Sequence, residues 1–283
     1  MRTLIFGAKG QLGRELMGLF RESGEVCGRD LPEVDIRDEA ALQPVFEAFG
    51  PELVINAAAY TDVDGAEDDL EGAFLANEAG ARNVAELAAF YDAPTVYYST
   101  DYVFDGAKDA PYTPDDPIDP VTVYGKSKAA GEVATRKANP HHFVLRTAWL
   151  YGPGGNHFIA KILRAAAAHS PLQVVEDEAG SPTYTMDLAK ATSALVRTQA
   201  YGIYHAANAG VCSRFELARE ALRVAGVDTP VEPCSASAFP AQACRPRFSA
   251  LDSSKLARST GYTMRPWQEA LEAYLQRTAG ERA

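Results

Sequence analysis

Tyr124 and Lys128 stand four residues apart in the segment VTVYGKSK, residues 121–128. On a helix their side chains would share one face, about one turn apart. Such a pair could give a proton to the oxygen of a ketone while hydride reaches its carbon. A free tyrosine, with a pKa of about 10, is a weak acid at neutral pH, and a nearby ammonium would lower that pKa by favouring the phenolate. The same spacing also occurs in ordinary solvated helix pairs, so the neighbouring residues decide between the two interpretations.

A hydroxyl that could orient the ketone lies upstream of this pair. Thr100 ends the apolar stretch TVYYST, and Ser99 is the neighbouring alternative. Because side chains alternate along a strand, only one of the two faces the open side. Lys128 could also hydrogen-bond the ribose of a nicotinamide cofactor, which would explain why it lies a turn away from the phenol. We therefore expect Thr100, Tyr124 and Lys128 to form the catalytic group.

A glycine-rich turn near the N-terminus indicates the cofactor. The segment FGAKGQLGREL places Gly7, Gly10 and Gly13 after a short apolar strand and at the start of a helical pattern. The tight turn needs a residue without Cβ, Gly10 lets the backbone approach a pyrophosphate, and Gly13 permits close helix–strand packing. The helix N-terminus supplies unpaired N–H groups. Together these features predict a bound dinucleotide. The small residues Ala57–Ala59, after a later strand, leave room for the cofactor or for a closely packed helix.

The residues after the second strand leave the choice between NADH and NADPH open. Asp30 and Asp35 lie near the distance at which an acidic residue meets a ribose 2′-hydroxyl, whereas Arg29 could meet a 2′-phosphate. Asp35 and Ile36 are expected along the adenine. Asp35 or Asp38 could equally cap the next helix.

Short apolar strands alternate with helical patterns through the first half of the chain. Strands are expected at 3–7, 25–28, 52–59, 94–100 and 143–152, with a long helix over 71–91 and another that carries Lys128. This alternation predicts an α/β fold with a Rossmann-type doubly wound parallel sheet, whose ligands bind beyond the carboxyl ends of the strands. Each chemical stretch described above begins at such an end.

The pattern changes after Tyr151, where loop-like segments precede one more expected strand near Ile203 and a largely helical tail. The Pro-, Ser- and Ala-rich stretch 231–252 is expected to be irregular. We predict a dinucleotide-binding domain of residues 1–151 with a return near 184–208. A smaller, mainly C-terminal substrate lobe would comprise residues 152–183 and 209–283.

Composition excludes several classes of partner. The 283 residues carry 27 basic and 38 acidic side chains, a net charge of −11, which argues against a general nucleic-acid or anionic-membrane binder. A single phosphorylated ligand in a local cationic pocket remains compatible with that charge. No stretch resembles a signal peptide or a membrane span. The four cysteines lack C-x-x-C spacing, which favours reduced thiols in a cytoplasmic protein.

The glycine turn, YYSTDYVFDG and YGKSKAAGE together resemble the extended short-chain dehydrogenase/reductase family. Within it, the stretches NAAAYTDVDGAE, RTAWLYG, GSPTYTMDLA, YHAANAG and RPRFSALDSSKL are similar to the dTDP-4-dehydrorhamnose reductases, and they span nearly the whole chain. The resemblance implies NAD(P)H-dependent reduction of the C4 ketone of dTDP-4-dehydro-L-rhamnose to dTDP-L-rhamnose. It implies NADPH as cofactor, with NADH as the alternative, a nucleotide-sugar substrate and a homodimer.

The resemblance also assigns roles to cofactor and catalytic residues. Tyr124 would donate the proton, Lys128 would tune it and hold the ribose, and Thr100 would orient the substrate. Gln11 and Leu12 would lie at the pyrophosphate.

Further residues are assigned to the cofactor and the sugar nucleotide in the same way. Thr61 and the alanines of residues 57–59 would lie beside the cofactor. Asp101, Tyr102 and Trp149 would face the sugar, and Arg245 would bind the diphosphate.

Two positions depart from the family pattern: Arg214 replaces an aromatic residue in CSRFEL, and Glu178 replaces a common glutamine in EDEAGSPTY. Both fall in the expected substrate lobe and leave the exact sugar nucleotide open. Glu15 matches a carboxylate that holds Mg²⁺ near the dimer contact in some relatives; one carboxylate on a helix is not enough to claim a metal, and the sequence leaves Mg²⁺ open.

Two other functions remain open at the level of sequence. One is a sugar-nucleotide epimerase or dehydratase of the same superfamily, although Tyr102 stands where a dehydratase has a carboxylate. The other is a non-catalytic dinucleotide-binding regulatory subunit, which the intact set of Thr100, Tyr124 and Lys128 disfavours.

Overall fold

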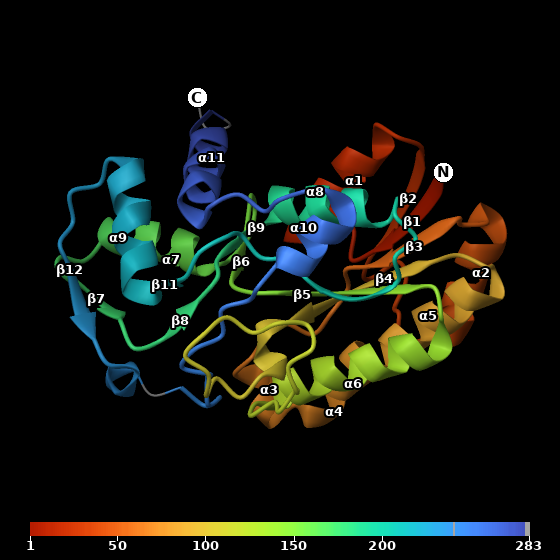
Figure 1. Ribbon diagram of the computed structural model, residues 1–283, viewed down its shortest axis with the longest axis horizontal. Coiled ribbons are helices and arrows are strands. Elements are labelled where there is room, and N and C mark those ends of the chain that lie inside the picture. Colours follow the sequence, from red (N-terminus) through yellow and green to blue (C-terminus); the bar gives the residue numbers. More distant parts are fainter. Residues whose placement is uncertain (240, 281–283) are drawn as a thin grey trace.

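Six parallel strands form the central sheet of the protein in the computed structural model, which describes residues 1–239 and 241–280 (Figure 1). Its order is β2-β1-β3-β4-β5-β10. The strands are β1 (Arg2–Phe6), β2 (Glu25–Arg29), β3 (Leu53–Asn56), β4 (Thr95–Thr100), β5 (His142–Thr147) and β10 (Gly202–His205). All four residues of β3 and all six of β4 are buried, as expected for strands covered on both faces. The predicted doubly wound parallel sheet is confirmed.

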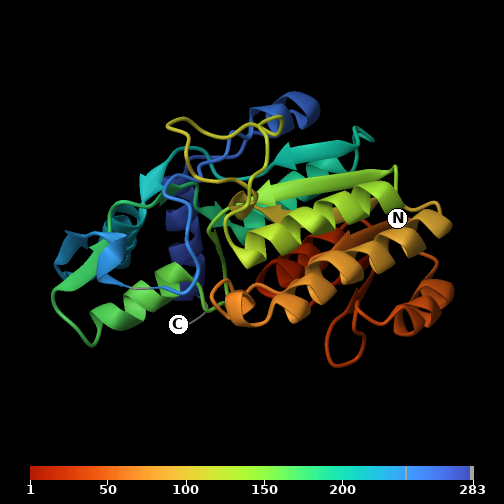
Figure 2. The same cartoon turned by 90° about the horizontal axis from the view of Figure 1, so that it is seen from below.

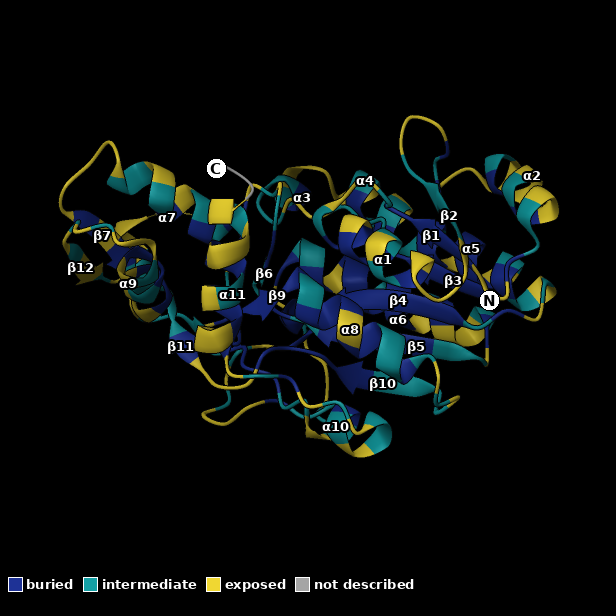
Figure 3. Ribbon diagram, turned by 90° about the horizontal axis from the view of Figure 1, so that it is seen from above, coloured by how far each residue is buried: buried dark blue, intermediate teal, exposed yellow. Residues whose placement is uncertain are grey.

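Helices cover both faces of this sheet. On one face lie α1 (Gln11–Arg21), α8 (Thr185–Leu195) and α10 (Ser254–Thr260), and on the other α2 (Glu39–Phe49), α5 (Gly80–Phe90) and α6 (Val123–Ala138). Figure 2 shows α5 and α6 side by side beneath the strands. Leu16 and Leu188 belong to the core on the first face, and Phe46 and Val84 to the core on the second. In Figure 3 the central strands such as β4 are buried, the edge strand β2 is only half-buried, and the helices expose their outer sides.

The helix expected over residues 71–91 is divided. The structure has α4 (Leu70–Phe74), a π-helical turn η1 (Leu75–Ala79) and then α5. The carbonyl of Asn77 accepts a hydrogen bond from the Tyr97 hydroxyl (3.1 Å), and its side-chain amide donates to Ser127 Oγ (2.9 Å). These contacts to the sheet and to α6 hold the wider turn, a feature that side-chain periodicity does not reveal.

The strand expected over residues 143–152 is also interrupted. β5 ends at Thr147, and β6 (Leu150–Tyr151) pairs with β9 (Thr183–Tyr184) outside the central sheet. Between them Trp149 adopts a φ of 46°, a left-handed conformation that no continuous strand accommodates. The chain therefore turns from the sheet into the second lobe at Trp149.

The second lobe is built from short elements around its own core, which includes Tyr151, Trp267 and Tyr274. Its helices and strands are α7 (Phe158–Ala166), β7 (Leu172–Val175), β8 (Ala179–Gly180), β11 (Cys212–Ser213), α9 (Arg214–Ala225), β12 (Val231–Cys234), the 3₁₀ turn η3 (Ala236–Ala238) and α11 (Trp267–Gly280). Two short helices, α3 (Gly65–Asp68) and the 3₁₀ turn η2 (Asp101–Val103), follow β3 and β4.

The expectation of irregular structure over 231–252 is wrong at its start, because β12 pairs in parallel with β7. The strand expected near Ile203 is present as β10, which pairs with β5. The division into two domains at the bounds given above stays a prediction. Residues 240 and 281–283 of the predicted substrate lobe lie outside the described residues. Among the described residues, no helix combines the length and the apolar character that a membrane crossing requires.

Candidate active site

A cavity of about 850 Å³ opens at the carboxyl ends of β1, β3 and β4. β1 and β3 are neighbours, while the strands that follow them lie toward opposite edges of the sheet, so the cavity occupies the topological switch point where open α/β sheets bind ligands. Every residue predicted to bind the cofactor lines it: Gly7, Gly10, Gln11, Leu12, Gly13, Asp30, Asp35, Ile36, Ala57, Ala58, Ala59, Thr61, Tyr124 and Lys128. Thr100, Asp101 and Trp149 line the same cavity.

The glycine turn has the geometry that a pyrophosphate needs. Gly7 has a φ of 75°, and a Cβ there would lie 2.5 Å from the carbonyl carbon of Ala57. A Cβ on Gly13 would lie 2.0 Å from the oxygen of Gly7, so both positions need glycine. Gly10 precedes α1 without forming a side-chain cap, which leaves the first N–H groups of the helix open toward the cavity. The buried Oε1 of Gln11 also lacks a hydrogen-bond partner within the described chain. These residues fit a dinucleotide.

At the adenosine end the two candidate carboxylates are already engaged. Asp30 accepts from the backbone N–H groups of Lys9 (2.7 Å) and Leu31 (2.8 Å). Asp35 binds the Arg37 guanidinium in a bidentate pair with a shortest distance of 2.6 Å, and the hydrogen bond from Arg37 lowers the pKa of Asp35.

Asp38, and not Asp35, caps the next helix, because its carboxylate accepts from the N–H groups of Ala40 and Ala41. Arg29 donates to the carbonyl of Gly28 (2.9 Å) and forms no ion pair within residues 1–239 and 241–280. At the adenosine end of the cavity, Arg29 is therefore a basic residue whose guanidinium has no carboxylate partner in the described structure.

Thr100 connects the catalytic residues. Its hydroxyl donates to Asp101 Oδ1 (3.0 Å) and accepts from the backbone N–H of Tyr102 (3.2 Å). The Thr100 hydroxyl lies beside the phenol of Tyr124 and lowers the pKa of that phenol, whereas burial raises it more strongly. The net pKa of Tyr124 is raised, so the sequence-based expectation of a lowered pKa is wrong for this structure. Lys128 is not among the groups that shift it.

Lys128 is buried in the wall of the cavity, with only 3% of its surface exposed. Its Nζ lies 4.2 Å from the centroid of the Tyr97 ring, a cation–π distance. Burial lowers the pKa of Lys128 to about 7, and the negative charge of Glu132, one helical turn further along α6, opposes this shift. A pKa of about 7 means that the charge of Lys128 changes near neutral pH.

The residues expected to face the sugar lie beside this group. Burial raises the pKa of Asp101 to about 6, against hydrogen bonds from Ser249 and Thr100 that lower it. The Tyr102 ring meets the Tyr124 ring edge to face, with centroids 5.8 Å apart. Tyr102, Trp149 and Arg245 line a second cavity of about 740 Å³, and Trp149 is shared by both cavities.

Arg245 is already paired in this second cavity. Its guanidinium binds both oxygens of Asp64 (2.6 and 3.2 Å), a residue that directly precedes α3. The two cavities meet at Trp149, so a long ligand could extend from the catalytic group toward Arg245.

Comparison with known proteins identifies the family. Residues 1–279 match the RmlD substrate binding domain. The protein belongs to the RmlD substrate-binding domain family.

Relatives of this RmlD-family protein are similar over nearly their whole length. A dTDP-4-dehydrorhamnose reductase of Mycolicibacterium smegmatis is 43% identical over 276 residues, which cover 96% of this chain and 84% of the relative. The crystal structure of a dTDP-4-dehydrorhamnose reductase from Clostridium acetobutylicum has a TM-score of 0.96 at 38% identity and covers 99% of this chain and 100% of that one. That of Bacillus anthracis, in complex with NADP, has a TM-score of 0.95 at 37% identity and covers 98% and 99%. The predicted family, the Rossmann-type fold and the class of oxidoreductase are confirmed.

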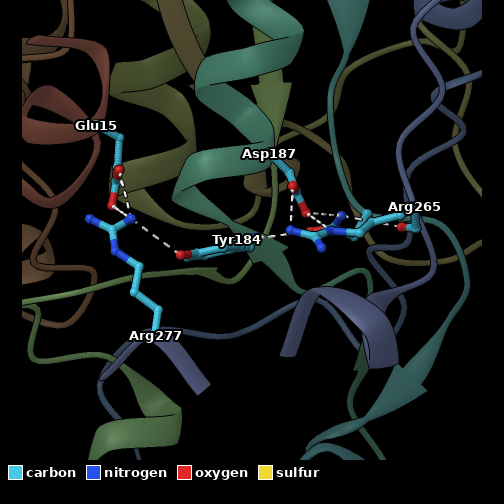
Figure 4. Close-up of polar contacts among 6 residues, drawn as sticks. Glu15, Tyr184, Asp187, Arg265 and Arg277 are labelled. Atoms are coloured by element: carbon cyan, nitrogen blue, oxygen red, sulfur yellow. Dashed lines mark hydrogen bonds and ion pairs between the residues drawn. The ribbon is translucent and has the colours of Figure 1, made fainter. Parts of the chain in front are cut away.

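In this RmlD-family chain Glu15 is paired with an arginine. Both of its oxygens accept from Arg277 Nη1 (2.8 and 3.0 Å), which also contacts the Tyr184 hydroxyl (3.4 Å), as Figure 4 shows. Asp187 and Arg265 form a second bidentate pair nearby. The described residues hold no cluster of three metal-ligating side chains. The pair of Glu15 and Arg277 ties α1 to α11 instead.

Sequence reasoning missed several residues of the RmlD-family site. Arg37 lines the cofactor cavity, and its position two residues after Asp35 was the available signal. Asn156 and His157, from the loop before α7, also line that cavity, and no motif in the sequence marks them. Ser249 reaches Asp101 from the far end of the chain. The roles of the individual residues that line both cavities stay predictions.

Proposed function

We propose that the protein reduces the C4 ketone of dTDP-4-dehydro-L-rhamnose to dTDP-L-rhamnose with NADPH. The observation that supports this most directly is that Thr100, Tyr124 and Lys128 line the same cavity as the glycine turn. The identity to dTDP-4-dehydrorhamnose reductases over nearly the full chain supports the choice of substrate.

In this proposal, side chains of the protein supply the proton that the ketone oxygen receives. NADPH, when bound along the glycine turn, supplies the hydride. Because burial raises its pKa, the Tyr124 phenol carries its proton at neutral pH and can donate it to the oxygen that becomes negative. Thr100, held by Asp101 and the N–H of Tyr102, orients that oxygen. Lys128 does not shift the pKa of Tyr124 in this structure, so its proposed role is to hold the ribose of the cofactor. Its ammonium would stabilise the phenolate only with the ligands bound.

The two cavities suit a nucleotide sugar. With the sugar at Thr100 and Tyr124, beside Asp101 and Tyr102, the rest of the substrate extends past Trp149 into the second cavity. Arg245 is proposed to bind the diphosphate there. Asp64 pairs with Arg245 and so fixes the orientation of the Arg245 guanidinium in this cavity.

NADPH is the preferred cofactor in this proposal. Asp35 is neutralised by Arg37, and Asp30 accepts two backbone hydrogen bonds, so neither carboxylate is free to bind a ribose hydroxyl alone. The guanidinium of Arg29, which has no carboxylate partner among the described residues, suits a 2′-phosphate.

The protein is proposed to be a cytoplasmic homodimer. A cytoplasmic protein is supported by the four cysteines, all of them free thiols. A homodimer is proposed from the family resemblance, and light scattering of the purified protein tests it.

Turnover of dTDP-4-dehydrorhamnose by the purified protein, followed as oxidation of added NADPH, tests the proposed function. We expect one NADPH oxidised per ketone reduced. Protein that purifies with tightly held NAD and shows no net NADPH oxidation would instead be an epimerase or dehydratase. Protein that binds NADPH but turns over no keto sugar, and copurifies with a partner, would be a regulatory subunit.

A further inference from the structure

The two positions that depart from the family pattern lie in contact. Arg214 begins α9 and Glu178 precedes β8, and the backbone N–H of Arg214 donates to the Glu178 carbonyl (3.2 Å). Their side chains face each other, with Arg214 Nε 3.7 Å from Glu178 Oε2. Only 17% and 15% of these side chains are exposed. The arginine and the carboxylate are therefore one partly buried ion pair.

Aromatic rings fix the plane of the Arg214 guanidinium. Its central carbon lies 3.5 Å from the centroid of the Trp149 ring and 5.2 Å from that of Phe158. The Trp149 indole in turn packs on Gly180, where an added Cβ would come within 2.7 Å of the ring. Stacking of this kind holds a guanidinium without using its hydrogen-bond donors.

Arg214 faces the second cavity together with Tyr102 and Arg245. That cavity is lined by three cations, Lys161, Arg214 and Arg245, against two carboxylates, Asp64 and Glu178, in a protein of net charge −11. Arg245 uses two of its N–H donors in a bidentate pair with Asp64. The Arg214 guanidinium forms no hydrogen bond within the described residues, and its contact with Glu178 is longer. Among the described residues, Arg214 and Lys161 are thus the cations of this cavity whose side chains form no hydrogen bond, and Arg214 is the one stacked on Trp149.

We propose that Arg214 binds the diphosphate of the nucleotide-sugar substrate, and that Glu178 holds the guanidinium in place until substrate displaces it. This inference rests on the proposed function for the identity of the substrate. Trp149 gives the guanidinium its orientation, and the planar donors then meet two phosphate oxygens at once. In this chain the anion site beside the sugar therefore uses a stacked arginine in addition to Arg245.

Binding of dTDP, measured by titration calorimetry without turnover, separates this inference from the proposed function. Arg214→Gln should weaken dTDP binding by about 10- to 100-fold, the range for loss of hydrogen bonds to a charged group. The matched control is Arg219→Gln, which removes an arginine stacked on Phe215 from the same helix but outside this cavity. Affinity for NADPH, bound in the other cavity, should survive in both variants.

The sign of the effect at Glu178 decides between a binding role and a structural one. Glu178→Gln should bind dTDP at least as tightly as the unsubstituted protein, because the carboxylate that competes for Arg214 is gone. Equal weakening by Glu178→Gln and Arg214→Gln would overturn the proposal, since the pair would then only hold Trp149. The proposal would also be overturned if Arg214→Gln bound dTDP as tightly as Arg219→Gln. Absence of ketone turnover with dTDP binding that follows the expected pattern would reject the proposed function alone.

Discussion

The Thr100 hydroxyl donates to the Asp101 carboxylate at 3.0 Å while it accepts from the Tyr102 N–H at 3.2 Å. Neighbouring residues of one chain segment thereby fix a side chain at the end of β4 before any substrate arrives. The phenol of Tyr124 lies beside this hydroxyl, which lowers the pKa of the phenol. Orientation that is fixed in advance is what a group contacting a reacting oxygen requires.

Thr100→Val should lower kcat/KM by about 10²- to 10³-fold, because the hydroxyl proton that Asp101 accepts here is the one that would turn to the developing oxyanion. Thr100→Ser, which keeps the hydroxyl, should retain most of the activity. Steady-state kinetics of both variants provides the measurement. Similar activity in Thr100→Val and the unsubstituted protein would show that the hydroxyl does not contact the substrate.

Arg29→Ala should reduce the preference for NADPH over NADH. Loss of a charge-assisted contact to the 2′-phosphate would lower the ratio of the two kcat/KM values by about tenfold or more, with the value for NADH nearly unaffected. Arg21→Ala removes an exposed arginine at the end of α1, outside the cofactor cavity, and serves as the control. An unchanged ratio in Arg29→Ala would assign the 2′-phosphate to another residue.

Lys128 should make the stability of the cofactor-free protein depend on pH. Its pKa is about 7 in the folded protein and 10.5 ordinarily. Between these values the unfolded chain binds a proton that the folded chain does not, so folding becomes more favourable as pH rises through this window. Relative to Lys128→Met, the free energy of unfolding should rise by up to about 1.4 kcal/mol per pH unit. Urea denaturation at pH values across this window measures the free energy of unfolding of both proteins. The same pH dependence in Lys128→Met and in the unsubstituted protein would contradict the lowered pKa of Lys128.

The buried pair of Glu132 and Arg146 should be important for stability. Its two contacts are both 2.8 Å, with side chains only 2% and 3% exposed. Glu132→Gln would leave the Arg146 charge buried without its partner, at a cost of about 3–5 kcal/mol in the free energy of unfolding. Glu220→Gln breaks the more exposed pair with Arg223 and should have little effect. Chemical denaturation measures the free energy of unfolding of both variants. Equal losses of that free energy in Glu132→Gln and Glu220→Gln would contradict the prediction.

The sequence predicted the sheet and the cofactor cavity well because both depend on local patterns. Runs of buried residues mark β3 and β4, and in a parallel sheet the residues that follow each strand meet at one edge. The glycines after β1 and the alanines after β3 therefore line one cavity, as expected.

What the sequence did not reveal depends on contacts between distant residues. The pairing of Glu178 with Arg214 joins positions far apart in the chain, so two separate departures from the family pattern became one ion pair only in the structure. The raised pKa of Tyr124 has the same origin, because it comes from burial of the phenol in the folded chain, which the spacing to Lys128 does not show. The left-handed turn at Trp149 is likewise held by Gly180 and Arg214, which no local pattern connects to it.

The central claim is that Tyr124 gives its proton to the ketone oxygen. Single-turnover oxidation of NADPH by Tyr124→Phe, with dTDP-4-dehydrorhamnose in excess, tests it most directly. The account predicts a rate at least about 10²-fold below that of the unsubstituted protein, the usual contribution of a positioned acid, with NADPH still bound. A rate in Tyr124→Phe equal to that of the unsubstituted protein would contradict it.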